Sequence, residues 1–429
     1  MYLTSKHFIN LWGIILIFLI LGSGCEKNIS DNGGSSPSAP SSEQASSKTK
    51  SNPETMTDKS LPDFQDTLLD IAIESAGAIA KEPFIKDRCR AQEAVVNTCL
   101  ELDQPKLALT YTAGIENWRR GLCHANVAFY CARHGYDPKL IQKELEIAEK
   151  IAQMDHGQQW RNDRIKVRIA QTHLLLGQPE QARRFNQSLV ESEQGKIAQT
   201  AATISNDETF DNQVKTLNDL IGLCGFETTI NALEGYAELY NRFYDDDLRR
   251  NLAETKIKTS WNKLPIPIRL TLLLRLAEFS LDHEDQDHAL ELVNEAQQFL
   301  DDFQWPLRNF LPEAAKAAQV RYRAGDKQNA RKNADAVWNR YQAEGSQIIN
   351  IYRAGALRPL AEAYQAMGAT DMALNVYKKA VEEGVDHPSK RSRALDLSAT
   401  CCSMASSAVE PDAELWTRIQ QIHEDLITE

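Results

Sequence analysis

Apolar residues recur every three to four positions, the period of a helix, along most of the chain from about residue 61 to the end. Leu360 and Tyr364 precede Gly368 at the spacing of one helix face, and Tyr377 and Val381 continue the pattern beyond it. Glycine suits the end of a helix because it adopts a left-handed backbone at little cost. The pattern therefore predicts two amphipathic helices that are separated at this glycine.

Four such pairs of predicted helices carry alanine at a fixed spacing. In each pair an alanine of the first helix is followed twelve residues later by an alanine of the second, and three pairs have a glycine five residues before the second alanine. A larger side chain where two helices meet so closely costs about 1–3 kcal/mol by overpacking. A unit that recurs in this way predicts an all-α solenoid of stacked antiparallel hairpins. The four sets are Ala170, Gly177 and Ala182; Ala277 and Ala289; Ala318, Gly325 and Ala330; and Ala361, Gly368 and Ala373.

These units resemble the tetratricopeptide repeat, which has small residues at corresponding places in its two helices. The best match runs from Leu360 to Ala380, and weaker versions occur near Gly135 and Asp103. The unit around Ala289 has Glu284 where the other three have glycine. Steps of 41 and 43 residues separate the last three units, so we expect hairpins of about 40 residues, longer than the family's usual 34. The resemblance implies a concave groove, lined by the first helix of each hairpin, that holds peptide segments.

The resemblance also assigns residues to this groove. They stand two positions before and one position after the first alanine of each set, on the side away from the second helix. Such a groove would be basic and polar, and arginine suits carboxylates because its donors form a fork. A merely solvated helix face would have the same composition, and the lysines and asparagines of the family's carboxylate clamp are not present. The groove residues are Arg168 and Gln171, Arg275 and Glu278, Lys316 and Gln319, and Pro359 and Glu362 with Arg358 beside this last pair.

Composition agrees with a folded helical protein. The 429 residues are 42% hydrophobic and 25% charged, which is ordinary for a soluble body, and the length suits two domains or one long solenoid. The formal net charge of −12 argues against a general nucleic-acid binder. We therefore expect no nucleic-acid partner.

The first 25 residues have the pattern of an export signal. Lys6 and His7 precede an uncharged run from Phe8 to Gly24, which is short for a permanent membrane span. The small residues that end at Cys25 resemble a bacterial lipoprotein box, in which this cysteine is lipidated, although Gly22 stands where the box usually has leucine. The resemblance implies a lipid anchor in the cell envelope, with the body in the periplasm or at the cell surface. A secreted protein and an uncleaved anchor are the alternatives.

The remaining chain divides by composition. Residues 26–60 are rich in Ser, Pro and Gly and predict a disordered tether of roughly 30 Å root-mean-square length. We expect degenerate helical repeats in residues 61–200 and clearer repeats in residues 201–429. Pro265 and Pro267 predict a break between helices, as does the segment from Trp305 to Pro312, whose aromatic residues we expect to pack inside.

Few residues indicate chemistry. A disulfide among Cys99, Cys123 and Cys131 is one interpretation, and buried thiols are the other. No CxxC or HExxH motif is present, so we expect no metal and no cofactor, and we interpret His283 and His288 as part of a solvated acidic loop. The chain also lacks GxSxG and the phosphate-binding loop, which argues against an enzyme.

Two functions remain for this sequence. The first is a membrane-tethered scaffold or adaptor that binds another envelope protein or a peptide through its concave face. The alternative is a surface lipoprotein that binds a glycan or another solute within a helical-repeat frame. That alternative needs exposed aromatic rings, for which the candidates are Trp118, Trp160 and Trp261.

Overall fold

The computed structural model describes residues 56–154, 156–186 and 189–428, which form 19 α-helices and two short 3₁₀ helices without any strand. The all-α prediction is confirmed. Cys25, the export signal and nearly all of the predicted tether lie outside the described residues. None of the helices in the described part combines the length and the hydrophobicity needed to cross a membrane. Residues 53–429 form one compact unit, and the predicted division between residues 200 and 201 falls inside a helix of this unit.

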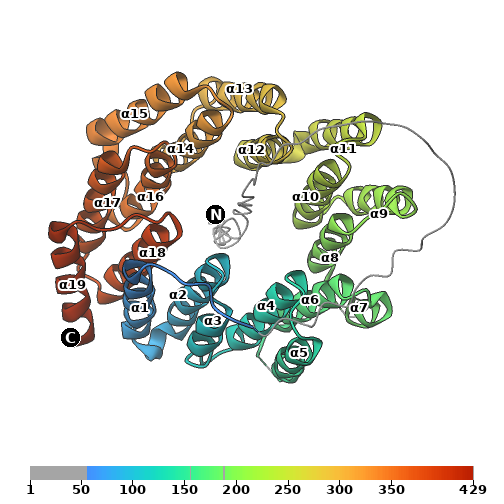
Figure 1. Ribbon diagram of the computed structural model, residues 1–429, viewed down its shortest axis with the longest axis horizontal. Coiled ribbons are helices and arrows are strands. Elements are labelled where there is room, and N and C mark those ends of the chain that lie inside the picture. The colour runs from blue at the N-terminus through green and yellow to red at the C-terminus, as the bar shows by residue number, and fades with distance from the viewer. Residues whose placement is uncertain (1–55, 155, 187–188, 429) are drawn as a thin grey trace, which may run out of the picture. The chain divides into compact units, whose positions relative to one another are not determined.

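The even-numbered helices form the inner layer of this unit, and the other helices pack outside them (Figure 1). The inner helices are α2 (Lys81–Glu101), α4 (Arg119–Arg133), α6 (Gln159–Leu175), α8 (Glu191–Thr203), α10 (Phe226–Arg242), α12 (Ile266–Asp282), α14 (Leu307–Arg323), α16 (Asn350–Ala366) and α18 (Lys390–Ser406). The others are α1 (Asp63–Ala78), α3 (Pro105–Thr112), α5 (Pro138–Ala152), α7 (Pro179–Asn186), α9 (Phe210–Gly222), α11 (Asp247–Ser260), α13 (Gln286–Asp302), α15 (Lys327–Glu344), α17 (Thr370–Val385) and α19 (Ala413–Thr428), with the 3₁₀ helices Trp261–Lys263 and Gly345–Gln347.

The inner helices close into a ring. Each contacts the next along the chain from α2 to α18, and α18 contacts α2 in turn (Figure 1). An open solenoid exposes the faces of its two terminal repeats, whereas here each end covers the other. The prediction of stacked hairpins is thus confirmed, and the closure of the stack is an addition that the repeat pattern did not indicate.

The spaced small residues form the hairpins as the sequence predicts. Of the eight alanines, seven are fully buried and Ala182 is 2% exposed. Gly177, Gly325 and Gly368 have φ of +69°, +93° and +71°, and each separates an inner helix from its outer partner. In the unit without glycine, Glu284 adopts the same left-handed backbone, with φ of +63°. The left-handed turn is therefore present in this unit too, although a side chain makes that backbone conformation less favourable than it is for glycine.

Aspartates begin several outer helices. The carboxylate of Asp326 accepts a hydrogen bond from the backbone N–H of Asn329, and Asp285, Asp246 and Asp137 cap their helices in the same way. These caps satisfy N–H groups that have no partner within the helix.

The first helix closes the ring. Helix α18 packs mainly against α1 and much less against α19, so α1 lies beside α18 as α17 lies beside α16. The Gln65 amide is buried at this seam and donates a 2.6 Å hydrogen bond to the carbonyl of Ala405. At the other end of α18, the Arg391 guanidinium contacts α2, at 3.1 Å from an Asp87 carboxylate oxygen and 4.4 Å from the centre of the Phe84 ring. We call the contact of α1 with α18 the closure seam.

One sequence expectation needs correction, and of the two interpretations of the cysteines the structure agrees with buried thiols. The turn at Pro306 is present, but Pro312 lies inside α14, in its second turn, where a proline removes one backbone hydrogen bond without ending the helix. Cys99, Cys123 and Cys131 are buried free thiols. The last two lie eight residues apart on α4, about 12 Å along its axis, which is too far for a disulfide between them.

Candidate functional site

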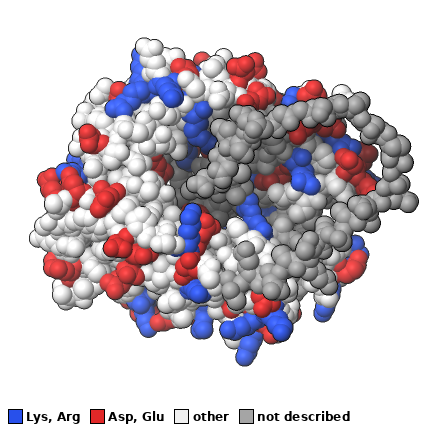
Figure 2. Space-filling view, viewed as in Figure 1, with Lys and Arg blue, Asp and Glu red and all other residues white. Residues whose placement is uncertain are grey.

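The face of the inner helices that looks away from the outer layer is the candidate site. On α12 the partly exposed polar residues Thr271, Arg275 and Glu278 share one stripe with the exposed Asp282, on the side away from the buried Ala277. The same register on α14 gives Pro312, Lys316, Gln319 and Arg323. Figure 2 shows that the middle of this unit is hollowed, with Lys, Arg, Asp and Glu side chains at the edge of the hollow. We call the stripes together the inner face.

Side chains of the inner face pair with those of neighbouring inner helices. Arg275 on α12 forms an ion pair with Glu238 on α10, and both side chains are largely buried. The Glu278 carboxylate lies 3.9 Å from the guanidinium of Arg323 on α14. These contacts run around the ring, so the charges hold adjacent repeats together as well as lining the surface.

The same arrangement recurs between α16 and α18. The Arg358 guanidinium lies 3.5 Å from the carboxylate of Asp396, and Glu362 accepts a 2.6 Å hydrogen bond from the hydroxyl of Ser403. Sequence reasoning placed Arg358 and Glu362 on this face, but it could not place the residues of α18 that hold them. Asp396 and Ser403 belong to a repeat whose turn, at Ala408 with φ of +52°, carries no glycine and escaped notice.

The other residues predicted for the groove differ in their surroundings. Gln171 is only 6% exposed, and its amide donates a 3.0 Å hydrogen bond to the carbonyl of Lys196 on α8, so it joins two inner helices. Lys316 lies 3.9 Å from Glu313 on its own helix, and Gln319 is half-buried. Arg168 lies with its guanidinium 4.5 Å from the centre of the Phe129 ring. The inner face is therefore of mixed charge, whereas the sequence predicted a basic and polar groove.

Several carboxyl groups of the inner face hold protons more tightly than usual. Burial raises the pKa of Glu278 to about 7, although Arg323 opposes the shift. Burial also raises the pKa values of Glu234, Glu313 and Asp396. Sequence reasoning assigned no such role to these acids, because acidic residues are frequent on every helix surface. At neutral pH the inner face is accordingly less negative than its composition indicates.

We expect Glu278→Gln to flatten the dependence of stability on pH. The folded-state pKa of about 7 exceeds the ordinary value of 4.5, so the folded protein binds more protons than the unfolded chain between these limits. Wild-type stability therefore falls as pH rises from about 4.5 to 7, by up to about 3 kcal/mol from this group. Thermal unfolding at pH 5 and pH 8 measures the change.

The control for this prediction is Glu284→Gln, which removes a carboxylate from an exposed turn. The drop in Tm between pH 5 and pH 8 should be smaller for Glu278→Gln than for wild type and for the control. Equal drops in all three proteins would contradict a protonated Glu278.

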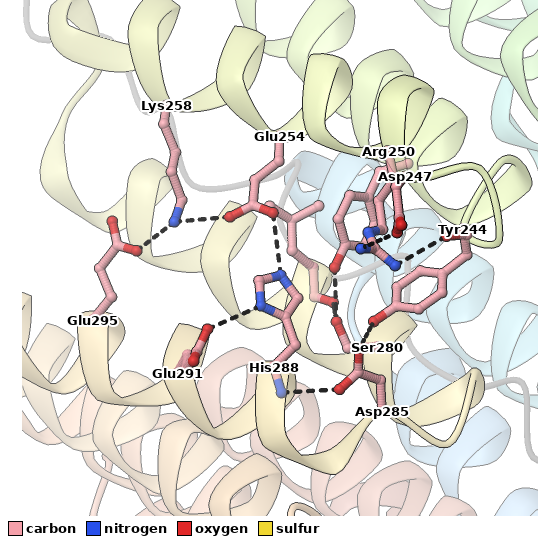
Figure 3. A network of polar contacts seen from close by, with 12 residues as sticks. Tyr244, Asp247, Arg250, Glu254, Lys258, Ser280, Asp285, His288, Glu291 and Glu295 are labelled. Atoms are coloured by element: carbon pink, nitrogen blue, oxygen red, sulfur yellow. Dashed lines mark hydrogen bonds and ion pairs between the residues drawn. The ribbon is translucent and has the colours of Figure 1, made fainter.

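A second polar cluster joins the acidic turn of α12 and α13 to α11 (Figure 3). His288 lies between the carboxylates of Glu254 and Glu291, at 3.1 and 3.2 Å, and Lys258 contacts both Glu254 and Glu295. The expectation of a solvated loop is thus wrong for His288, which is half-buried and joins two outer helices. Burial opposes ionisation of Glu254, but hydrogen bonds from His288 and Lys258 outweigh it and lower its pKa to about 2.

Aromatic packing extends this cluster towards the inner layer. The Tyr244 hydroxyl donates a 2.9 Å hydrogen bond to Asp285, and the His283 ring stacks on the Tyr244 ring at 4.3 Å between centres. Such a network fixes the turn between α12 and α13. Within the described residues, no group of three or more His, Cys, Asp or Glu side chains is arranged to hold a metal ion.

The three candidate tryptophans divide into two kinds. Trp118 and Trp261 are each 5% exposed and belong to the core, whereas Trp160 is 38% exposed. The Trp160 ring meets Trp118 edge-on at 5.4 Å between centres, and the guanidinium of Arg164 lies 5.1 Å from its centre. Trp160 is therefore the member of the three that offers an aromatic ring to a ligand.

An open cavity of about 560 Å³ lies where α13 leads into α14. Phe303, Trp305, Phe310 and Arg340 are among the residues that line it. The Arg340 guanidinium lies 4.3 Å from the centre of the Phe310 ring, and the Trp305 indole donates a 3.0 Å hydrogen bond to the carbonyl of Phe299. Aromatic rings beside an arginine make this cavity a second candidate site, which the sequence did not reveal.

Comparison with known proteins assigns no family to the chain. No protein-family model matches the chain, and no curated protein is significantly similar to it. A solved circular tandem repeat protein, described as having novel repeat topology and enhanced subunit contact surfaces, aligns with 85% of this chain and 94% of its own. The two are 14% identical, and the TM-score is 0.25.

Proposed function

We propose that this protein is a membrane-tethered scaffold that binds an extended segment of another envelope protein at its inner face. The observation that supports the proposal is the inner face itself, where stripes of partly exposed polar residues follow neighbouring inner helices. Helical repeats often present such continuous surfaces to partners. The proposal includes a lipid anchor at Cys25, and it involves no catalytic residue, cofactor or metal.

The chemistry of the inner face suits a polypeptide ligand. An extended chain offers N–H donors and C=O acceptors all along its length, and the paired arginines and carboxylates of the inner face offer both kinds of partner. A surface of mixed charge also keeps the protein from binding every polyanion or polycation without selection.

Photo-crosslinking from native membranes tests this function. A benzophenone amino acid at Lys316 or Gln319 should capture one envelope protein, because both side chains lie on the inner face of α14. The matched control is Lys332, an exposed residue of the outer helix α15, where we expect no capture. Capture at Lys332 alone would contradict binding at the inner face. Cys25→Ser should move the protein out of the membrane fraction, and retention there would contradict the lipid anchor.

A glycan- or solute-binding lipoprotein is the second candidate, favoured by the cavity at Trp305. The same experiment separates the two functions when it is combined with fluorescence titration. Absence of crosslinks at the inner face, together with oligosaccharide quenching that Trp305→Phe removes, would replace the scaffold by this alternative.

A further inference from the structure

Arg168 differs from the other arginines of the described residues. Each of the others either forms a hydrogen bond or an ion pair or is exposed to solvent. Arg168 is only partly exposed, and no carboxylate among the described side chains pairs with it. Its guanidinium lies against the Phe129 ring, and burial lowers the pKa of Arg168 to about 10. Because a desolvated charge without a partner is costly, this position indicates an anionic ligand.

Helices α4 and α6 carry few acids, unlike the chain as a whole. Helix α4 contains no acidic residue, and Asp163 is the one acid of α6. Burial lowers the pKa of Arg119 to about 10, and the charges of Arg90 and Arg164 add to this effect. Arg90, Arg119 and Arg164 therefore lie near one another on α2, α4 and α6, with Glu93 paired to Arg119 and Glu193 3.8 Å from Arg164.

Spacing along α6 indicates the form of the ligand. Trp160, Arg164 and Arg168 follow one another at intervals of four residues, which is about 6 Å on a helix. Alternate side chains of an extended peptide are about 6.6 Å apart, so successive carboxylates of such a peptide match successive arginines. A single small anion would occupy one of these positions and leave the others unused.

We infer that the α4–α6 sector of the inner face binds an extended acidic segment with carboxylates at alternate positions. The inference rests on the proposed scaffold function and names the chemistry of its partner. Arg168 holds one carboxylate through its forked donors while Phe129 packs against its guanidinium. Arg164, whose Nε lies 3.8 Å from Glu193, holds the next carboxylate through its two remaining nitrogens. Trp160, near the N-terminal end of α6, covers the end of the segment.

The test measures binding of a fluorescein-labelled eight-residue peptide of alternating Glu and Leu to the full chain. Arg168→Gln should weaken binding at least about tenfold, since a charge-assisted hydrogen bond is lost. The variant should fold normally, because no described carboxylate loses a partner. The matched control is Arg183→Gln on the outer helix α7, where the side chain is 63% exposed, and binding should not change. Higher salt should weaken binding further.

Any of three results would overturn the inference. The first is equal affinity of Arg168→Gln and wild type for the acidic peptide. The second is equal binding of a peptide of alternating Lys and Leu. The third is complete competition by inorganic phosphate at the same charge concentration. If Arg168→Gln leaves crosslinking of the envelope partner at Gln319 unchanged, the scaffold function is supported and the inference that the bound segment is acidic is wrong.

Discussion

Leucine at both Ala72 and Ala76 is expected to open the ring at the closure seam. Both alanines are fully buried, and they share a helix face with Gln65, which bonds to α18. Each added side chain should cost about 1–3 kcal/mol, because small residues let α1 and α18 approach closely. The hairpins themselves do not depend on the seam, so helicity should persist while the ends separate. Small-angle scattering should report a larger radius of gyration with an unchanged far-ultraviolet circular dichroism spectrum.

Two control variants identify the cause of this opening. Ala343→Leu adds the same side chain to an exposed position of α15 and should change neither shape nor stability. Ala361→Leu overpacks a buried position within one hairpin and should lower Tm without enlarging the particle. If the seam variant lost helicity in proportion to its shape change, the ring and its hairpins would unfold together, and the seam would not be a separate contact.

Arg275→Ala is expected to lower the free energy of unfolding by about 3–5 kcal/mol. The substitution removes the guanidinium that pairs with the largely buried carboxylate of Glu238. The carboxylates of Glu238 and Glu234, both on α10, are close enough to repel each other. Arg275→Glu should be worse, since it adds a third carboxylate. Urea denaturation measures the difference at pH 7.

Glu238→Gln provides the compensating variant. Combined with Arg275→Ala, it removes the orphaned charge, so the double variant should recover a large part of the lost stability. If the losses of unfolding free energy of the two single variants add in the double variant, the two residues act independently. The result also limits the use of Arg275 in binding experiments, because a loss of partner capture by Arg275→Glu would not separate binding from folding.

Local chemistry allowed the sequence to predict the hairpins. Helical period, a left-handed residue at the turn and alanine at each crossing all act within about 40 residues, as at Ala361, Gly368 and Ala373. The same register placed Arg275, Glu278, Lys316 and Gln319 on the face away from the outer helices, because side-chain direction follows from helical geometry. Whether these residues bind a partner stays a prediction.

Close packing at two helical glycines was not predicted from the sequence, because these glycines lie outside the repeating pattern of small residues. A Cβ added to Gly195 would lie 2.6 Å from Asn231, and one added to Gly235 would lie 2.7 Å from Leu217. These glycines let α8 approach α10 and let α10 approach α9, although neither ends a helix. A glycine inside a helical pattern indicates such an approach only when the neighbouring helix is known.

The helical period and the spacing of the alanines were thus sufficient to predict helical hairpins, the residues between their helices and the polar residues that face away. They did not indicate that the stack closes, that α1 packs beside α18, or that acids of adjacent repeats pair with Arg275 and Arg358. Closure has no local pattern because it depends on a small rotation at every repeat, summed around the ring. Contacts such as that of Gln65 with Ala405, 340 residues apart, have no local signal because they arise from this sum.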